Sequence, residues 1–223
     1  MTGDPAPRLS RELVALRVAR LLQRGWTVNL GIGLPTLVAQ FIGADDEVTL
    51  HVESGVLGAG PPGDPPGDPD LIDAQSQPIT LLPGAAITSS AEAFAMVRGG
   101  HLDAAVLGGM QVSANADLAN WRRPGKGLGG IGGAMDIAQG ARRLIVAMLH
   151  SAADGTPRLV ERCTLPLTAR SCVDTVVTDV AMIRFISGQP VLCEVVDGWS
   201  ADAVQAVTGL QLQRAAEVVR VDI

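Results

Sequence analysis

A glutamate that follows an apolar segment is the residue of this sequence best placed to do chemistry. Glu53 ends that segment, and the chain beyond it contains Gly55, Gly58 and Gly60. In α/β proteins, ligands bind at the carboxyl ends of strands, where a single side chain can face a large substrate. Most carboxylates in proteins are solvated or ion-paired, so Glu53 is a candidate reactive group that needs support from other residues.

A second candidate is the glycine cluster at residues 127–133, which precedes an apolar segment beginning at Ala134. The cluster matches G-x-G-x-x-G, but residues 121–126 are not the strand that must precede a dinucleotide fingerprint, so we exclude NAD. Adjacent glycines at the start of a helix leave backbone N–H groups uncovered, and these groups can bind an anion or a developing oxyanion. Simple tight turns explain the glycines equally well.

The other reactive residue types indicate no further chemistry. The histidines lie on or beside apolar segments without the spacing of metal ligands: His51, His101 and His150. We expect them to be packed or capping residues. The cysteines match no zinc or redox spacing and are expected to be free thiols: Cys163, Cys172 and Cys193. The sequence has no serine nucleophile elbow, HExxH motif or phosphate loop, and we expect no bound metal.

The elements that position these residues alternate between strands and helices. Apolar segments predict strands at 26–30, 47–52, 79–82, 103–107, 143–149, 172–178, 182–186, 191–196 and 218–221. Periodicity and capping residues predict helices at 10–24, 35–42, 89–98, 134–138 and 200–207. This alternation predicts an α/β fold with an open, largely parallel sheet and some antiparallel pairing near the end. We expect one domain over residues 1–223, with residues 1–8 disordered and residues 61–69 forming a Pro/Gly loop.

Composition excludes several classes of partner. The 223 residues are 47% hydrophobic and carry a net charge of −6, which leaves no basic face for nucleic acid or an anionic membrane. The first 22 residues lack the order of a signal peptide, and no segment reaches the ~20 apolar residues of a membrane span. We therefore expect a cytoplasmic protein.

Ordered motifs along most of the chain point to a known family. They lie at 28–37, 53–61, 82–84, 89–101, 117–121, 130–136, 163–168 and 178–181. Through these motifs the sequence resembles the B (β) subunit of family I coenzyme A transferases of the 3-oxoacid type. The resemblance implies the fold of the coenzyme A transferase and ribose-5-phosphate isomerase group. It also implies a homologous A (α) subunit, in a heterodimer or heterotetramer, and acyl-CoA and carboxylic acid substrates without a permanently bound cofactor.

The same resemblance assigns roles to residues. Glu53 is the implied nucleophile, which attacks the acyl-CoA thioester and carries CoA as a glutamyl thioester in a ping-pong mechanism. Backbone groups around Asn29 and the turn at Gly132 and Gly133 are the implied oxyanion donors. The residues expected to lie along CoA and the substrate are Gly31, Gly33, Ser54, Gly55, Gly58 and Gly60.

One position departs from the family pattern, which places Asn directly after the catalytic Glu, whereas this chain has Ser54. Serine still offers one donor and an acceptor, so we expect activity to survive with altered geometry or substrate preference. The resemblance implies transfer of CoA from succinyl-CoA to acetoacetate or 3-oxoadipate. Two alternatives stay open. One is a non-catalytic CoA-binding or assembly subunit, and the other is an acyl-CoA hydrolase in which water intercepts the intermediate.

Overall fold

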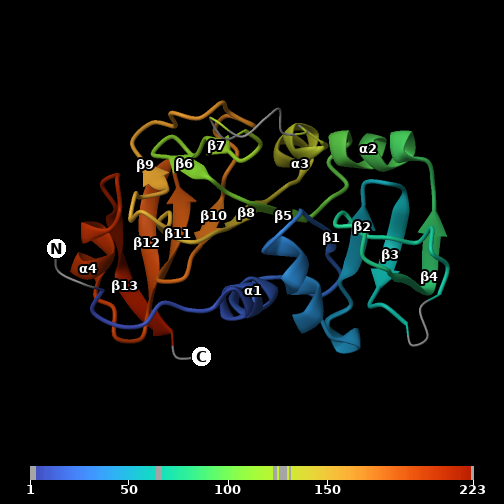
Figure 1. Cartoon of the computed structure of the whole chain (residues 1–223), viewed down its shortest axis with the longest axis horizontal. Coiled ribbons are helices and arrows are strands. Elements are labelled where there is room, and N and C mark those ends of the chain that lie inside the picture. The colour runs from blue at the N-terminus through green and yellow to red at the C-terminus, as the bar shows by residue number, and fades with distance from the viewer. Residues whose placement is uncertain (1–3, 64–66, 123–124, 126–129, 131, 222–223) are drawn as a thin grey trace.

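A ten-stranded β-sheet extends along the molecule in the computed structural model, which describes residues 4–63, 67–122, 125, 130 and 132–221 (Figure 1). The strand order is β13-β12-β11-β10-β8-β5-β1-β2-β3-β4. These strands are β1 (Thr27–Leu30), β2 (Thr49–Val52), β3 (Val56–Gly60), β4 (Thr80–Ile87), β5 (Ala104–Gly108), β8 (Leu144–Ala147), β10 (Thr175–Val177), β11 (Ala181–Ile186), β12 (Gln189–Val196) and β13 (Gln213–Val221). A three-stranded sheet, in the order β7-β6-β9, comprises β6 (Gln111–Ser113), β7 (Leu118–Ala119) and β9 (Leu159–Val160).

The central strands pair in parallel and the outer ones mostly antiparallel. Strands β10, β8, β5, β1 and β2 form the parallel centre, and β2–β3, β3–β4, β10–β11 and β11–β12 pair antiparallel. All four residues of β8 are buried, as a strand covered on both faces requires. The predicted open, largely parallel α/β sheet is therefore confirmed.

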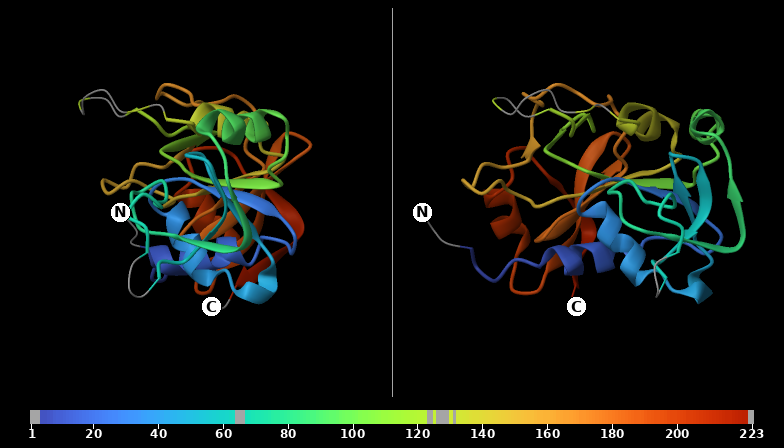
Figure 2. Two further views of the ribbon diagram at one scale, coloured as in Figure 1. Left: turned by 90° about the vertical axis from the view of Figure 1, so that its right-hand side faces the viewer. Right: turned by 45° about the vertical axis from the view of Figure 1, so that its right-hand side comes forward.

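Helices cover both faces of the sheet. They are α1 (Arg11–Ala19), α2 (Ser90–Arg98), α3 (Ala134–Gly140) and α4 (Ala201–Ala206), with 3₁₀ helices η1 (Pro35–Phe41) and η2 (Ala44–Asp46). Figure 1 and Figure 2 show α2 and α3 on one side of the sheet and α1 on the other. Each side has its own apolar core, because Val97 and Ile137 pack in one cluster and Val14 and Val38 in another.

Side-chain caps fix where two helices begin. Ser10 accepts a hydrogen bond from the Leu13 N–H at 3.3 Å and starts α1. Ser89 accepts from the Glu92 N–H at 3.2 Å, and the Glu92 carboxylate accepts from the Ser89 N–H at 2.9 Å. This reciprocal pair is the capping box expected from the sequence, and it fixes the start of α2.

Several predicted bounds differ from the structure. The helix predicted at 35–42 is 3₁₀ rather than α, and β6 and β7 lie where no strand was predicted. Strand β3 occupies a glycine-rich segment that the sequence did not identify as a strand. Strand β4 runs past the predicted end at residue 82, because residues 82–85 bulge out opposite Gly58 while pairing resumes at Ala86.

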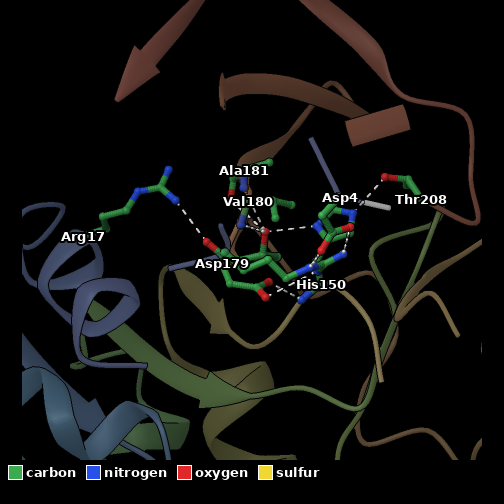
Figure 3. A network of polar contacts seen from close by, with 9 residues as sticks. Asp4, Arg17, His150, Asp179, Val180, Ala181 and Thr208 are labelled. Carbon is green, nitrogen blue, oxygen red and sulfur yellow. Dashed lines mark hydrogen bonds and ion pairs between the residues drawn. The ribbon is translucent and has the colours of Figure 1, made fainter. Parts of the chain in front are cut away.

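A buried polar network ties the start of the described chain to the β10–β11 end of the sheet (Figure 3). Arg8 lies 3.4 Å from the Asp179 carboxylate and stacks over Trp199, and the Leu9 N–H donates to the Asp179 carbonyl. Asp179 also accepts from the His150 N–H at 2.7 Å. Of the residues expected to be disordered, 1–3 lie outside the described part of the chain, as do 64–66 of the Pro/Gly loop.

Within the described residues, no helix is long and apolar enough to span a membrane.

Candidate active site

Glu53 lies in the turn between β2 and β3, half-buried at the carboxyl end of a parallel strand. The turn closes with a hydrogen bond from the Gly55 N–H to the Val52 carbonyl at 3.0 Å. The Gly55 carbonyl accepts from the Thr88 N–H at 2.7 Å, directly before α2. The turn that carries the carboxylate is therefore anchored to the sheet on one side and to the start of α2 on the other.

Asn29 faces this carboxylate from the neighbouring strand. It pairs with His51 in the parallel register of β1 and β2, and its side chain is fully buried. The Asn29 Nδ2 amide lies 3.2 Å from Glu53 Oε2 and 3.1 Å from the His51 carbonyl oxygen. Because β1 is paired on both sides, it is the side-chain amide of Asn29, rather than its backbone, that faces Glu53.

His51 completes a polar cluster of three side chains. It is 3% exposed and lies under α2, where its Nε2 is 3.3 Å from the Ala93 carbonyl oxygen. Burial lowers the pKa of His51, while the hydrogen bond to Ala93 and the charge of Glu53 act in the opposite direction. The sequence pattern indicated no more than a packing role for His51. Its position two residues before Glu53, on the same face of the strand, is the signal that could have identified it.

The glycines after Glu53 have a structural reason of their own. Gly55 adopts a φ of 123°, and an added Cβ would overlap the Thr88 carbonyl oxygen. A Cβ on Gly58 would lie 3.0 Å from Ala85, and one on Gly60 would lie 2.7 Å from Thr80 Oγ1. Close approach of β4 therefore requires small residues along β3. Their predicted role along CoA stays a prediction.

Gly31 and Gly33 flank an exposed turn after β1. Gly31 donates its N–H to the Val106 carbonyl at 2.8 Å, and an added Cβ would lie 2.8 Å from Leu107 Cδ2. Gly33 has a φ of 96° with open space around it, and Ile32 between them is 66% exposed. The structure places this turn at the end of the strand that carries Asn29.

The glycine turn before α3 packs against α2, the helix whose start also anchors the turn that carries Glu53. Gly133 is the N-cap of α3, and an added Cβ would lie 2.5 Å from Phe94 Cζ on α2. The two helices are also joined by the Arg98–Asp136 ion pair at 2.8 Å. Gly132 has a φ of 53° with open space around it. Residues 127–129 and 131 of the glycine cluster lie outside the described residues.

Ser54 is exposed beside Glu53. Among the residues that the structure describes, no group of three or more His, Cys, Asp or Glu side chains could hold a metal ion. Burial raises the pKa of all three free cysteines, that of Cys163 to about 11 and that of Cys172 to about 12. Cys163 and Cys172 therefore stay protonated thiols near neutral pH.

A cavity of about 980 Å³ lies beside the polar cluster, formed by η1, β2, β3, β4 and the segment 73–79. Its lining is mainly apolar and includes Leu50, Val52 and Leu57, and it meets the site at His51. Glu53 is not among the lining residues. We therefore take the polar cluster, rather than this cavity, as the candidate active site.

Fold and site together define an open-sheet α/β protein in which a carboxylate is held at the end of a parallel strand, beside a buried amide. The family model described as "Coenzyme A transferase" matches residues 11–206. The chain belongs to the coenzyme A transferase family, as a B-type subunit of its family I, which confirms the resemblance noted in the sequence.

Relatives of known sequence match nearly the whole chain. The beta subunit of acetate CoA-transferase from Escherichia coli is 47% identical over 209 residues, covering 94% of this chain and 96% of its own. The B subunit of 3-oxoadipate CoA-transferase from Pseudomonas putida is 46% identical over 207 residues, covering 92% and 97%. The B subunit of a probable succinyl-CoA:3-ketoacid coenzyme A transferase from Bacillus subtilis is 44% identical over 200 residues, covering 89% and 93%.

Solved structures share the fold at low identity. The acyl-CoA transferase YdiF of E. coli O157:H7, as the apoenzyme, superposes with a TM-score of 0.77 at 20% identity. The alignment covers 97% of this chain but 44% of that longer chain. Glutaconate coenzyme A-transferase from Acidaminococcus fermentans gives a TM-score of 0.73 at 17% identity, covering 96% and 89%. The sheet seen here is thus the sheet of known CoA-transferases.

Proposed function

We propose that this chain is the catalytic B subunit of an enzyme that moves CoA from succinyl-CoA to a 3-oxoacid, acetoacetate or 3-oxoadipate, with Glu53 as nucleophile. The observation that carries the proposal is the hydrogen bond between the Asn29 amide and the Glu53 carboxylate at the strand end. A carboxylate held by a neutral donor, with no cation paired to it in the described structure, stays available to attack. Membership of the family supplies the reaction class.

The first half of the reaction moves CoA onto the enzyme. A carboxylate oxygen of Glu53 attacks the thioester carbonyl, the carbon–sulfur bond breaks, and CoA thiolate leaves a mixed anhydride. The thiolate then attacks the glutamyl carbonyl and expels the donor acid as its carboxylate. CoA is thereby held as a glutamyl thioester, and the energy of the original thioester is conserved.

The second half reverses these steps with a different acid. The carboxylate of the acceptor attacks the glutamyl thioester, expels CoA thiolate and forms a second mixed anhydride. The thiolate attacks the acyl carbonyl of the acceptor, which releases acyl-CoA and restores the Glu53 carboxylate. Donor and acceptor acids thus use the same site in turn, as ping-pong kinetics requires.

Each tetrahedral intermediate needs hydrogen-bond donors at its oxyanion, where the loss of one donor costs roughly 10²–10³ in rate. Candidates are the Asn29 side-chain amide and the backbone of the turn at Gly132 and Gly133. The Asn29 amide is supported by its position beside Glu53. The glycine turn is supported by its packing on α2, whose start anchors the Glu53 turn.

CoA itself is proposed to reach Glu53 along Gly31, Gly33, Ser54, Gly55, Gly58 and Gly60. The open space around Gly33 and the exposure of Ser54 support this route. The glycines of β3 support it less, because contacts within the chain already explain them.

The working enzyme is proposed to include a homologous A subunit, in a heterodimer or heterotetramer in the cytoplasm. The relatives are named as B or beta subunits. The alignment with the acyl-CoA transferase YdiF covers 44% of that longer chain, which is the length expected if a second part of similar size is joined to it there.

Acetate is a second candidate for the acceptor acid, because the E. coli relative at 47% identity is named as part of an acetate CoA-transferase. The exposed Ser54 side chain is one difference from the family pattern that could alter acid preference. Comparing kcat/KM for acetate, acetoacetate and 3-oxoadipate, with succinyl-CoA as donor, separates the two candidates.

The direct test is borohydride reduction of the complex of this chain with its A subunit in the presence of acyl-CoA. Reduction of a glutamyl-CoA thioester converts the Glu53 side chain to an alcohol, which peptide mass spectrometry identifies. We expect this product only when acyl-CoA is present, and we expect Glu53→Gln to abolish both the product and CoA transfer.

The controls separate the remaining alternatives. Glu217→Gln changes an exposed carboxylate on β13, at one edge of the sheet and far along it from β2, and should retain transfer. Normal turnover by Glu53→Gln would overturn the proposal and leave a non-catalytic CoA-binding subunit. Release of free CoA at the same rate with and without an acceptor acid would instead indicate an acyl-CoA hydrolase.

A further inference from the structure

The polar cluster beneath α2 contains a histidine for which the proposed reaction has no direct use. His51 is 3% exposed and Asn29 is fully buried, and both lie in the sheet next to Glu53. Burying polar side chains costs free energy unless their hydrogen bonds are arranged in full. The arrangement in this cluster can be deduced from its two backbone carbonyls, which can only accept hydrogen bonds.

The first carbonyl fixes the tautomer of His51. Its Nε2 lies 3.3 Å from the Ala93 carbonyl oxygen, so Nε2 carries the hydrogen. Burial lowers the pKa of His51, which favours the neutral ring. The other ring nitrogen, Nδ1, therefore presents a lone pair and acts as an acceptor.

The second carbonyl fixes the side-chain amide of Asn29. The His51 carbonyl oxygen lies 3.1 Å from Asn29 Nδ2, so the nitrogen and not the oxygen of the amide faces it. The same nitrogen lies 3.3 Å from His51 Nδ1 and 3.2 Å from Glu53 Oε2. One NH₂ group thus faces three acceptors, while Asn29 Oδ1 is buried without a hydrogen-bond partner among the described residues.

We propose that His51 is a positioning residue for the nucleophile: as a neutral Nε2–H imidazole it accepts from the Asn29 amide and holds that amide against Glu53. This inference rests on the proposed function. With the acceptor at Nδ1 in place, rotating the amide would bring its oxygen against three acceptors at once. Without the acceptor at Nδ1, the Asn29 amide loses one of the contacts that fix its direction, and the Glu53 carboxylate loses a fixed donor.

Two variants of similar size separate this role from simple packing. Asn at position 51 can place its Oδ1 near the position of Nδ1, so His51→Asn keeps an acceptor for Asn29. Gln at position 51 reaches toward the position of Nε2, so His51→Gln keeps a donor for the Ala93 carbonyl but leaves no acceptor beside Asn29. Unfolding midpoints of both variants confirm that each has folded.

The kinetic result expected in the complex with the A subunit is a loss in kcat without a rise in KM. A misplaced nucleophile costs on the order of 10²-fold in rate, so we expect His51→Gln to lower kcat by about 10- to 100-fold. His51→Asn should restore most of that rate. Equal kcat for His51→Gln and the parent enzyme, or a loss that appears only in KM, would overturn the role assigned to His51.

A second measurement reports the geometry without any turnover. A long-range ¹H–¹⁵N spectrum of ¹⁵N-histidine-labelled complex, assigned with His51→Asn, should show His51 as the neutral Nε2–H tautomer near pH 7. A neutral Nδ1–H tautomer or an imidazolium at that pH would overturn the inference. If the enzyme transfers CoA and His51→Gln does not change kcat, the inference about His51 is wrong and the proposed function stands. If the parent enzyme is inactive and Glu53 stays unmodified, the proposed function is wrong as well.

Discussion

At the scale of single residues, a second buried histidine is held differently from the one beside Glu53. His150 is fully buried, with Nε2 2.9 Å from Thr208 Oγ1 and Nδ1 3.0 Å from Thr178 Oγ1. The Thr208 hydroxyl donates to the Val204 carbonyl at 2.7 Å, so it accepts from Nε2–H. The buried ring of His150 thus lies between two hydroxyl groups, and Figure 3 shows His150 beside Thr208.

This environment predicts a stability that depends on pH. Burial, with a smaller contribution from Arg8, lowers the pKa of His150 to about 3. The unfolded chain binds a proton below its usual value of about 6.5, while the folded chain does not. The free energy of unfolding therefore falls as pH falls below about 6.5, by up to about 1.4 kcal/mol per pH unit.

Chemical denaturation between about pH 5 and pH 7 measures this slope. His150→Gln should lower the free energy of unfolding at pH 7. It should also reduce the slope of that free energy against pH, because glutamine at position 150 takes up no proton when the chain unfolds. His101→Gln, at an exposed histidine, should leave the slope as in the parent. The prediction is wrong if the slope is the same in all three proteins.

The sequence alone placed Glu53 at a strand exit, because that position is visible in the order of residues, and the family resemblance implied its role as nucleophile. It could not assign His51 or His150, because both look like histidines on apolar strands. Their roles depend on which carbonyl or hydroxyl faces each ring nitrogen. Those partners are Ala93 on α2 for one and Thr208 after α4 for the other, and both lie more than 40 positions away in the chain.

At the scale of elements, the hairpin β2–β3 and helix α2 form the frame of the site. The turn after Glu53 is held by the residues that begin α2, and the glycine turn of α3 packs on the same helix. Gly55 is the contact point, since its φ of 123° belongs to the region that favours glycine and an added Cβ would overlap Thr88. Gly55 therefore connects the start of α2 to the turn that carries the Glu53 carboxylate.

Gly55→Ala is expected to destabilise the protein by about 2–5 kcal/mol, combining backbone strain with overpacking. It should also lower CoA transfer, because the turn carrying Glu53 must shift. Denaturant unfolding gives the first value and an activity assay the second. Gly67→Ala is the matched control, because Gly67 is exposed with open space around it. Equal stability of the two variants would contradict the prediction.

Elements with continuous apolar runs were predictable, and elements built on glycine were not. The buried centre of the sheet, such as β8, was identified from the sequence because its four residues are all apolar. Strand β3 was not predicted because Gly58 and Gly60 are typical of a turn rather than a strand. In the structure these glycines allow the bulged strand β4 to pack closely against β3. Strands β6 and β7 have three and two residues, too few for any periodicity to show.

At the scale of the whole molecule, the two edges of the large sheet differ in character. Strand β13 forms one edge and carries Arg214, Glu217 and Arg220, charges of the kind that keep an edge from pairing with another chain. Strand β4 forms the other edge and has no charged residue. Its exposed side chains include Leu82 at 42% and Ile87 at 66%, so this edge lacks that protection.

The isolated chain is therefore expected to self-associate through β4 as its concentration rises, since exposed apolar edge strands pair with other chains. Ile87→Lys should lower the mean mass measured by light scattering over a concentration series. Val219→Lys makes the same change in charge at the β13 edge, where Val219 is 51% exposed, and should leave association unchanged. A monomer at every concentration, or an equal effect of both variants, would contradict the prediction. With the proposed A subunit present, an unchanged effect of Ile87→Lys would show that this edge stays uncovered in the complex.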